Sequence, residues 1–162
     1  MAENELRRHR CCFTGHRPEK LQMTESAVKE ALEYEIEAAI SDGFHTFISG
    51  MARGVDLWAA DIVIEKRRAE SGIKLIAASP FCGFEERWSH EWRQRYYFVL
   101  KEANLVRYIC SGYSRNCFQI RNEWMVNHSA RVIAVYNGEA GGTRNTIEYA
   151  KRLNVPTFTI CK

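Results

Sequence analysis

Short apolar runs and amphipathic segments alternate along the 162-residue chain. The apolar runs are rich in β-branched residues, which is typical of strands covered on both faces. The segments between them repeat apolar residues at helical spacing, as Val28, Leu32, Ile36 and Ile40 do. This pattern predicts strands at residues 11–14, 44–48, 73–78, 105–110, 132–136 and 155–160. It predicts helices at 26–41, from the 49–56 turn to 70, at 84–103, at 118–128, and from the 138–143 loop to 153.

Strands that alternate with helices along the whole chain predict an α/β fold with a mainly parallel sheet and right-handed crossovers. Parallel strands end at one common edge, and open α/β sheets bind ligands along that edge. The connections that follow the strand ends should therefore converge there. They comprise residues 16–17, 50–56, 79–81, 111–112 and 138–143.

Length and composition indicate a single domain spanning residues 1–162. With 46% hydrophobic and 27% charged residues, the chain has the composition of a soluble globular protein. No apolar run approaches the roughly 18 residues of a membrane helix, so we expect no membrane partner. The charged N-terminus lacks the apolar core of a signal peptide, so we expect a cytoplasmic protein with residues 1–9 as a frayed tail. The net charge of +3 does not by itself indicate nucleic-acid binding, although it leaves room for a local basic patch.

The six cysteines include no CxxC pair, which favours reduced thiols over a disulfide framework. Four of them fall in or beside predicted strands, where cysteine behaves as a small apolar side chain: Cys11, Cys12, Cys110 and Cys161. Cys82 and Cys117 lie near the expected site but have no obvious histidine or metal partner. The five histidines show neither HxxxH nor HExxH spacing, so we predict no metal site and no tightly bound cofactor.

The most informative stretch is residues 130–150, where a buried-strand pattern leads into a glycine loop that opens a helix. Gly138, Gly141 and Gly142 permit a tight turn and leave space for a ligand, and we expect Thr143 to cap the helix. Free N–H groups and the helix dipole would together form an anion site. The alternative is an ordinary strand-to-helix turn without a ligand.

Four arginines fall within or beside the converging connections: Arg17, Arg53, Arg121 and Arg144. Guanidinium groups bind phosphate oxygens in a bidentate fork, so this cluster favours a phosphate-bearing ligand. The alternative is solvated arginines paired with Glu19, Asp56 or Glu123. Asp56 could favour the helix dipole or bind a ribose hydroxyl. His16 could donate to phosphate or only pack in its loop, whereas we expect Glu148, deep in the last helix, to be structural.

Three aromatic residues, Trp88, Trp92 and Tyr96, are spaced four apart in the segment predicted as the third helix. We expect this stripe to pack against the sheet or against a partner subunit. The alternative is a platform on which nucleic-acid bases stack.

Several motifs of this chain resemble the YpsA-like family of the SLOG superfamily. They are FTGHRPEKL at 13–21, ISGMARGVDLWAA at 48–60, SPF at 79–81 with Trp88 soon after, IRNEWMV at 120–126 and GGTRNTIEYA at 141–150. Parts of them are also similar to the Rossmann-like domain of DprA-type proteins, which bind single-stranded DNA, and to LOG-type phosphoribohydrolases. The resemblance implies a Rossmann-like three-layer α/β/α sandwich that binds a nucleotide or a nucleotide-derived signal.

Two departures bear on function. LOG-type enzymes carry a glutamate two or three residues after the glycine-loop threonine, where this chain has Asn145 and Thr146. The carboxylate expected to assist glycosidic hydrolysis is therefore missing, although Arg121 matches the LOG arginine. DprA proteins usually carry further domains that this chain lacks.

We therefore predict a sensor or regulator that binds a phosphate-containing, nucleotide-like ligand. The predicted ligand-binding residues are Gly15, His16, Arg17, Ser49, Gly50, Arg53, Gly54, Asp56, Arg121, Asn122, Gly141, Gly142 and Thr143. Two alternatives remain open: a nucleoside-monophosphate phosphoribohydrolase that uses Arg121 with Asp56 or Glu148, and single-stranded DNA binding. A homodimer is also possible from the sequence.

Overall fold

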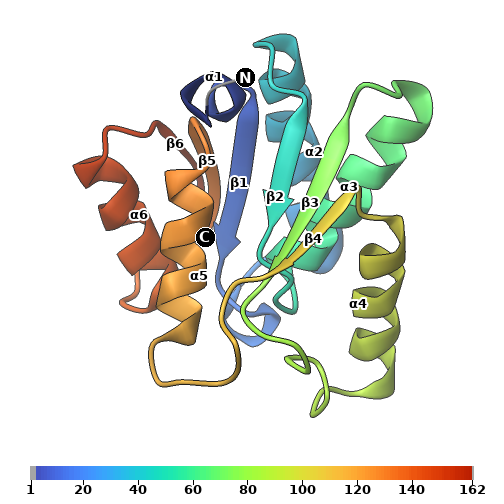
Figure 1. Cartoon of the computed structure of the whole chain (residues 1–162), viewed down its shortest axis with the longest axis vertical. Helices are drawn as coiled ribbons and strands as arrows, with labels where there is room; N and C mark the ends of the chain where they lie inside the picture. Colours follow the sequence, from blue (N-terminus) through green and yellow to red (C-terminus); the bar gives the residue numbers. More distant parts are fainter. Residues whose placement is uncertain (1–2, 162) are drawn as a thin grey trace.

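A computed structural model describes residues 3–161, which form a six-stranded, all-parallel sheet (Figure 1). The strands are β1 (Arg10–Gly15), β2 (Thr46–Ser49), β3 (Lys74–Ser79), β4 (Leu105–Tyr108), β5 (Arg131–Tyr136) and β6 (Thr157–Cys161). Their order across the sheet is β4-β3-β2-β1-β5-β6, and all five neighbouring pairs are parallel. The predicted parallel α/β sheet is confirmed.

Helices cover both faces of the sheet and complete the expected α/β/α sandwich (Figure 1). One face carries α2 (Glu25–Ser41), α3 (Val55–Ala69) and α4 (His90–Glu102). The other carries α5 (Cys117–Asn127) and α6 (Gly142–Arg152). Two short helices, α1 (Glu3–Arg7) and the 3-10 helix η1 (Pro18–Lys20), flank β1 along the chain.

Local sequence accounts for these elements. The middle of β1, Cys11–Thr14, and of β5, Val132–Val135, is buried, because both strands lie inside the sheet under helices. Helix α2 buries its apolar stripe, and its Thr24 cap accepts a hydrogen bond from the Ala27 N–H at 3.1 Å. The helix ends just before Gly43, whose φ of 99° favours glycine.

The structure differs from the sequence predictions near the N-terminus and at the start of α4. Within the predicted frayed tail, of which residues 1–2 lie outside the described residues, Glu3–Arg7 is a helix. The Arg7 Nε donates to the Ser129 carbonyl at 2.8 Å, and Glu3 pairs with Arg10 at 3.0 Å, which hold this helix in place. The helix predicted to begin at residue 84 begins instead at His90, because Gly83 has a φ of 93° and Ser89 provides the N-cap.

The strand order places a topological switch between β1 and β5. From β1 the chain moves outward through β2 and β3 to β4, and then returns to the other side of β1 to form β5 and β6. The connections leaving β1 and β5 therefore part in opposite directions, which opens a crevice at the strand ends. This is the lower edge of the sheet in Figure 1.

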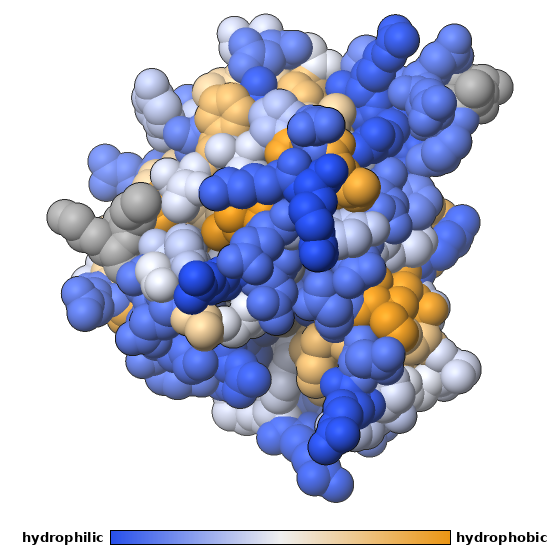
Figure 2. All heavy atoms as spheres, turned by 90° about the vertical axis from the view of Figure 1, so that its left-hand side faces the viewer, coloured by the Kyte–Doolittle hydropathy of each residue, from blue (hydrophilic) through white to orange (hydrophobic). Residues whose placement is uncertain are grey.

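The surface on the side of α6 and β6 is mainly hydrophilic, with apolar side chains in separate spots (Figure 2). None of the helices among residues 3–161 has both the length and the apolar character needed to cross a bilayer. Cys11 and Cys12 are fully buried in β1, as their strand positions predicted.

Candidate ligand-binding site

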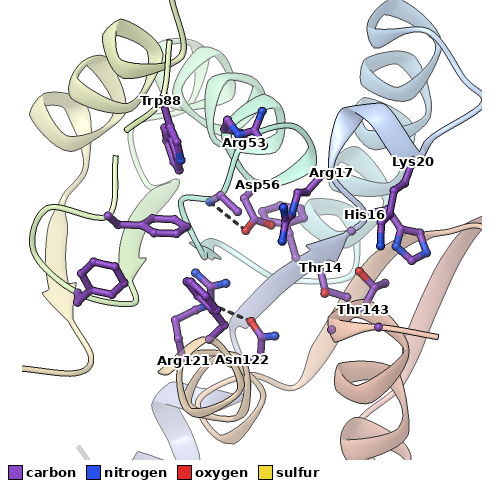
Figure 3. Close-up of a pocket in the computed structure, with 18 of the residues that line it drawn as sticks. Thr14, His16, Arg17, Lys20, Arg53, Asp56, Trp88, Arg121, Asn122 and Thr143 are labelled. Carbon is purple, nitrogen blue, oxygen red and sulfur yellow. Dashed lines mark hydrogen bonds between the residues drawn. The ribbon is translucent and has the colours of Figure 1, made fainter. Parts of the chain in front are cut away.

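A cavity of about 970 Å³ opens at the carboxyl ends of the strands (Figure 3). Its lining comes from the segments that follow β1, β2, β3 and β4 and from the start of α6 after β5. The predicted convergence of these connections is confirmed. Ten of the thirteen predicted ligand-binding residues line the cavity: Gly15, His16, Arg17, Arg53, Asp56, Arg121, Asn122, Gly141, Gly142 and Thr143.

The other three, Ser49, Gly50 and Gly54, lie behind the lining and shape the β2–α3 connection. The Ser49 hydroxyl donates to the Asp56 carbonyl at 2.8 Å and accepts from the Met51 N–H at 3.2 Å. Met51 has a φ of 67°, a conformation that costs a non-glycine residue about 1 kcal/mol or more. The serine thus closes a strained turn that places Asp56 in the first turn of α3.

Asp56 and Arg121 form the buried centre of the cavity. Asp56 Oδ2 accepts a hydrogen bond from the Ala52 N–H at 3.2 Å. Arg121 on α5 donates through Nη1 to the Gly50 carbonyl and through Nε to Asn122 Oδ1, the latter at 2.8 Å. A Cβ on Gly50 would lie 2.8 Å from Asp56 Oδ2 and 3.0 Å from the Arg121 guanidinium carbon, so glycine is required for this approach.

Burial dominates the protonation of this pair. It raises the pKa of Asp56 from 3.8 to about 6, although the nearby Arg121 charge and the Ala52 N–H favour the ionised carboxylate. Burial lowers the pKa of Arg121, and Asp56 opposes that shift. Of the carboxylates proposed from sequence as arginine partners, Asp56 thus interacts electrostatically with Arg121.

Two of the glycines serve packing between elements. A Cβ on Gly15 would lie 2.4 Å from Val55 Cγ2, so the end of β1 can touch α3 only because this residue is glycine. Gly54 has a φ of 90° and faces the Pro18 ring, which its Cβ would approach to 2.8 Å.

The glycine loop after β5 ends in α6, whose N-cap is Gly141. The prediction that Thr143 caps this helix is wrong, because Thr143 lies in the first turn and makes no capping bond. The backbone alone provides the turn, since Gly141 has a φ of 148° that few other residues adopt. The first-turn N–H groups have no intrahelical acceptor and lie beside the cavity.

The predicted arginine cluster is only partly assembled. Arg17 and Arg53 line the cavity with Arg121, and Arg53 also pairs with Glu19 at 3.5 Å, as the alternative interpretation proposed. Arg144 lies outside the cavity lining and pairs with Glu148 at 3.3 Å on the exposed surface of α6.

His16 is packed rather than free to move. Its ring stacks on Tyr136 with centroids 5.5 Å apart, and its Nε2 is buried without a hydrogen-bond partner among the described residues. Burial, together with the nearby charge of Lys20, lowers the pKa of His16, which favours a neutral ring.

The aromatic stripe divides into two parts. Trp92 packs on Trp58 with centroids 6.1 Å apart, and the Tyr96 hydroxyl lies 2.8 Å from Ser79 Oγ in the core, which confirms the packing interpretation for these two residues. Trp88 also packs edge-to-face on Tyr96, with centroids 5.5 Å apart, but it precedes α4 and lines the cavity as well.

Sequence reasoning missed several lining residues: Thr14, Lys20, Ala52, Gly83, Phe84, Glu86, Arg87, Tyr113 and Phe118. The available signal was the aromatic residues that follow β3 and β4 closely in sequence, although Phe84, Trp88 and Phe118 fell in segments predicted as helices. Among the described residues, no group of three or more His, Cys, Asp or Glu side chains is placed to hold a metal ion.

Comparison with known proteins identifies the family. The sequence matches the YspA SLOG family, also written YpsA, over residues 11–156. The chain belongs to this YpsA family. Relatives include the UPF0398 proteins of Bacillus thuringiensis (strain Al Hakam) and Bacillus cereus (strain AH187), each 30% identical over 148 residues. Each alignment covers 86% of this chain and 80% of the relative.

Two solved structures of DNA processing protein A share the Rossmann-like fold of this YpsA-family chain. The Helicobacter pylori protein, described with a single-stranded DNA binding mode, has a TM-score of 0.66 at 17% identity. The Streptococcus pneumoniae protein has a TM-score of 0.62 at 16% identity. The similarity covers 97% and 95% of this chain but only 66% and 50% of those two chains.

Proposed function

We propose that this YpsA-family protein binds a phosphate-containing nucleotide or nucleotide-derived ligand in the cavity and acts as a sensor or regulator. One observation carries the proposal. The first-turn amides of α6, which have no intrahelical acceptor, and the side chains of Arg17 and Arg121 line the same cavity at the switch point of the sheet. Helix N-termini and guanidinium groups are both suited to phosphate oxygens.

The charge of the lining supports an anionic ligand. Five lining side chains are cationic, Arg17, Lys20, Arg53, Arg87 and Arg121, whereas only Asp56 and Glu86 are acidic. Within residues 3–161, Arg17 and Lys20 make no ion pair, so both can bind a ligand without breaking an existing contact. An anion would therefore meet a net positive, partly enclosed surface.

The acidic groups argue for binding rather than efficient hydrolysis. The α6 side chains at the position of the LOG glutamate are Asn145 and Thr146, and Thr146 donates to the Gly142 carbonyl at 2.8 Å. Glu148, one of the carboxylates considered from sequence, pairs with Arg144 outside the cavity lining. Asp56 is the carboxylate that remains beside Arg121. Because the glutamate of LOG-type enzymes is missing, incubation with nucleoside 5′-monophosphates should release almost no free base. Rapid release that is lost in Asp56→Asn would establish the hydrolase alternative.

Calorimetric titration with AMP tests the binding site. Arg17→Ala removes an exposed side chain that lines the cavity, and loss of charge-assisted bonds of about 1.5–3 kcal/mol should weaken binding roughly tenfold to a hundredfold. Arg144→Ala is the matched control, because it removes an exposed arginine outside the lining. Equal affinities in the wild type and both variants would place the ligand elsewhere.

Single-stranded DNA is the second candidate ligand, because the Helicobacter pylori structural neighbour binds it and the rim of the cavity is basic. A strand that contacts many phosphates loses affinity steeply as salt rises, whereas a ligand with one or two phosphates loses much less. Titrations at two salt concentrations therefore separate the two candidates.

A further inference from the structure

Five aromatic residues form one end of the cavity, and we call them the aromatic wall. They are Phe81, Phe84, Trp88, Tyr113 and Phe118. Phe81, Phe84 and Trp88 lie in the connection after β3, Tyr113 lies between β4 and α5, and Phe118 lies in the first turn of α5. All five therefore gather on the β3–β4 side of the sheet. In Figure 3, Trp88 lies on one side of the cavity, and His16, Lys20 and Thr143 lie on the other.

The rings hold one another in fixed orientations without parallel stacking. Phe84 meets Trp88 at 4.9 Å and 73°, and Phe81 meets Tyr113 at 6.0 Å and 84°. Phe118 is tilted against Phe84 at 5.6 Å and 51°. Edge-to-face and tilted contacts of this kind are favourable between rings, so the wall is organised before any ligand binds.

Phe84 and Trp88 pack against the core, whereas Tyr113 and Phe118 extend beyond it. Tyr113 is 72% exposed and Phe118 is 37% exposed, although both line a concave surface. Aromatic side chains exposed in a cavity lose contact with water only when a partner covers them, which favours a flat apolar ligand group.

The opposite end of the cavity is suited to the anionic group of the same ligand. The amides of α6 and the side chains of Arg17 and Lys20 lie on the β1–β5 side, and β2 and β1 separate β3 from β5 in the sheet. A ligand that satisfies both ends is elongated, with an aromatic ring at one end and an anion at the other.

We propose that the aromatic wall stacks the base of the nucleotide whose phosphate binds at α6. This inference rests on the proposed function and adds the orientation of the ligand and a requirement for its base. Every nucleobase presents a π face, so stacking strengthens binding of all four common bases. A sugar phosphate without a base binds more weakly because it leaves the wall uncovered.

Titration of three probes tests the wall: AMP, ribose 5-phosphate and inorganic phosphate. Tyr113→Ala and Phe118→Leu remove exposed rings, and Tyr34→Ala is the matched control, because Tyr34 is 71% exposed on α2 outside the cavity lining. The wild type should bind AMP about tenfold or more tightly than ribose 5-phosphate. Each wall variant should lose most of that preference while its affinity for ribose 5-phosphate stays unchanged, and Tyr34→Ala should match the wild type.

The outcomes distinguish this inference from the proposed function. Equal affinities for AMP and ribose 5-phosphate, with inorganic phosphate still bound, would overturn the base-stacking role and leave the phosphate site intact. Absence of binding for all three probes in the wild type would overturn both. Oligothymidylate that binds far more tightly than TMP and is weakened by Tyr113→Ala would assign the wall to single-stranded DNA instead.

Discussion

The buried carboxylate of Asp56 should make the free energy of unfolding decrease as the pH rises from 4 to 7. Its pKa is about 6 in the folded protein, against an ordinary value of 3.8. The stabilising contribution is fully present below 3.8 and is lost as the pH passes 6, because the folded state must then ionise a buried group. A difference of two pKa units corresponds to about 3 kcal/mol.

Asp56→Asn isolates this contribution, because the amide oxygen can still accept from the Ala52 N–H but the side chain no longer titrates. Between pH 4.5 and 7.5, the stability of the variant relative to the wild type should increase by about 2 kcal/mol. Urea unfolding followed by circular dichroism at both pH values measures this difference. Glu30→Gln, which alters an exposed carboxylate on α2, controls for surface charge.

An identical stability difference between Asp56→Asn and the wild type at both pH values would contradict this expectation. In that case Asp56 would have the same proton affinity in the folded and unfolded states, and burial beside Arg121 would not destabilise its charge.

Three further results are expected. Gly142→Val should abolish binding of inorganic phosphate, because its side chain would fill the space beside the α6 amides. The melting temperature should change little, since a Cβ there meets only Asn122 Nδ2 at 3.8 Å, and calorimetry measures both quantities. Gly15→Ala should lower stability by about 1–3 kcal/mol in urea unfolding, since its Cβ would overlap Val55, and unchanged stability would contradict this close approach. AMP affinity should fall only slightly between 50 and 200 mM salt, whereas a steep fall would indicate many phosphate contacts.

The fold was predictable from the sequence because apolar periodicity determines which elements can be buried. The glycine loop and the segments after β1 and β2 were also predictable, since parallel strands bring their carboxyl ends to one edge. The Thr143 cap was not predictable in this way, because Gly141 occupies the N-cap position in a backbone conformation that needs no side-chain hydrogen bond.

The aromatic wall could not be assigned from spacing alone. Trp88, Trp92 and Tyr96 have helical spacing, but α4 begins at His90, so Trp88 belongs to the preceding turns. Its ring packs on Phe84 and Tyr96, and Phe84 in turn packs on Phe118, about thirty residues later in the chain. Contacts between segments that are distant in sequence therefore orient the rings of the wall, and the local spacing of aromatic residues does not predict such contacts.

The hydrogen bond from Arg121 to the Gly50 carbonyl joins α5, on one face of the sheet, to the connection that enters α3 on the other face. The buried centre of the cavity, here called its floor, therefore helps to fix the helix layers on the two faces of the sheet relative to each other. Substitutions there are constrained by folding as well as by binding, whereas the exposed rings at the rim are far less constrained by folding. Within such a family, ligand preference can diverge through the rim while the floor stays the same.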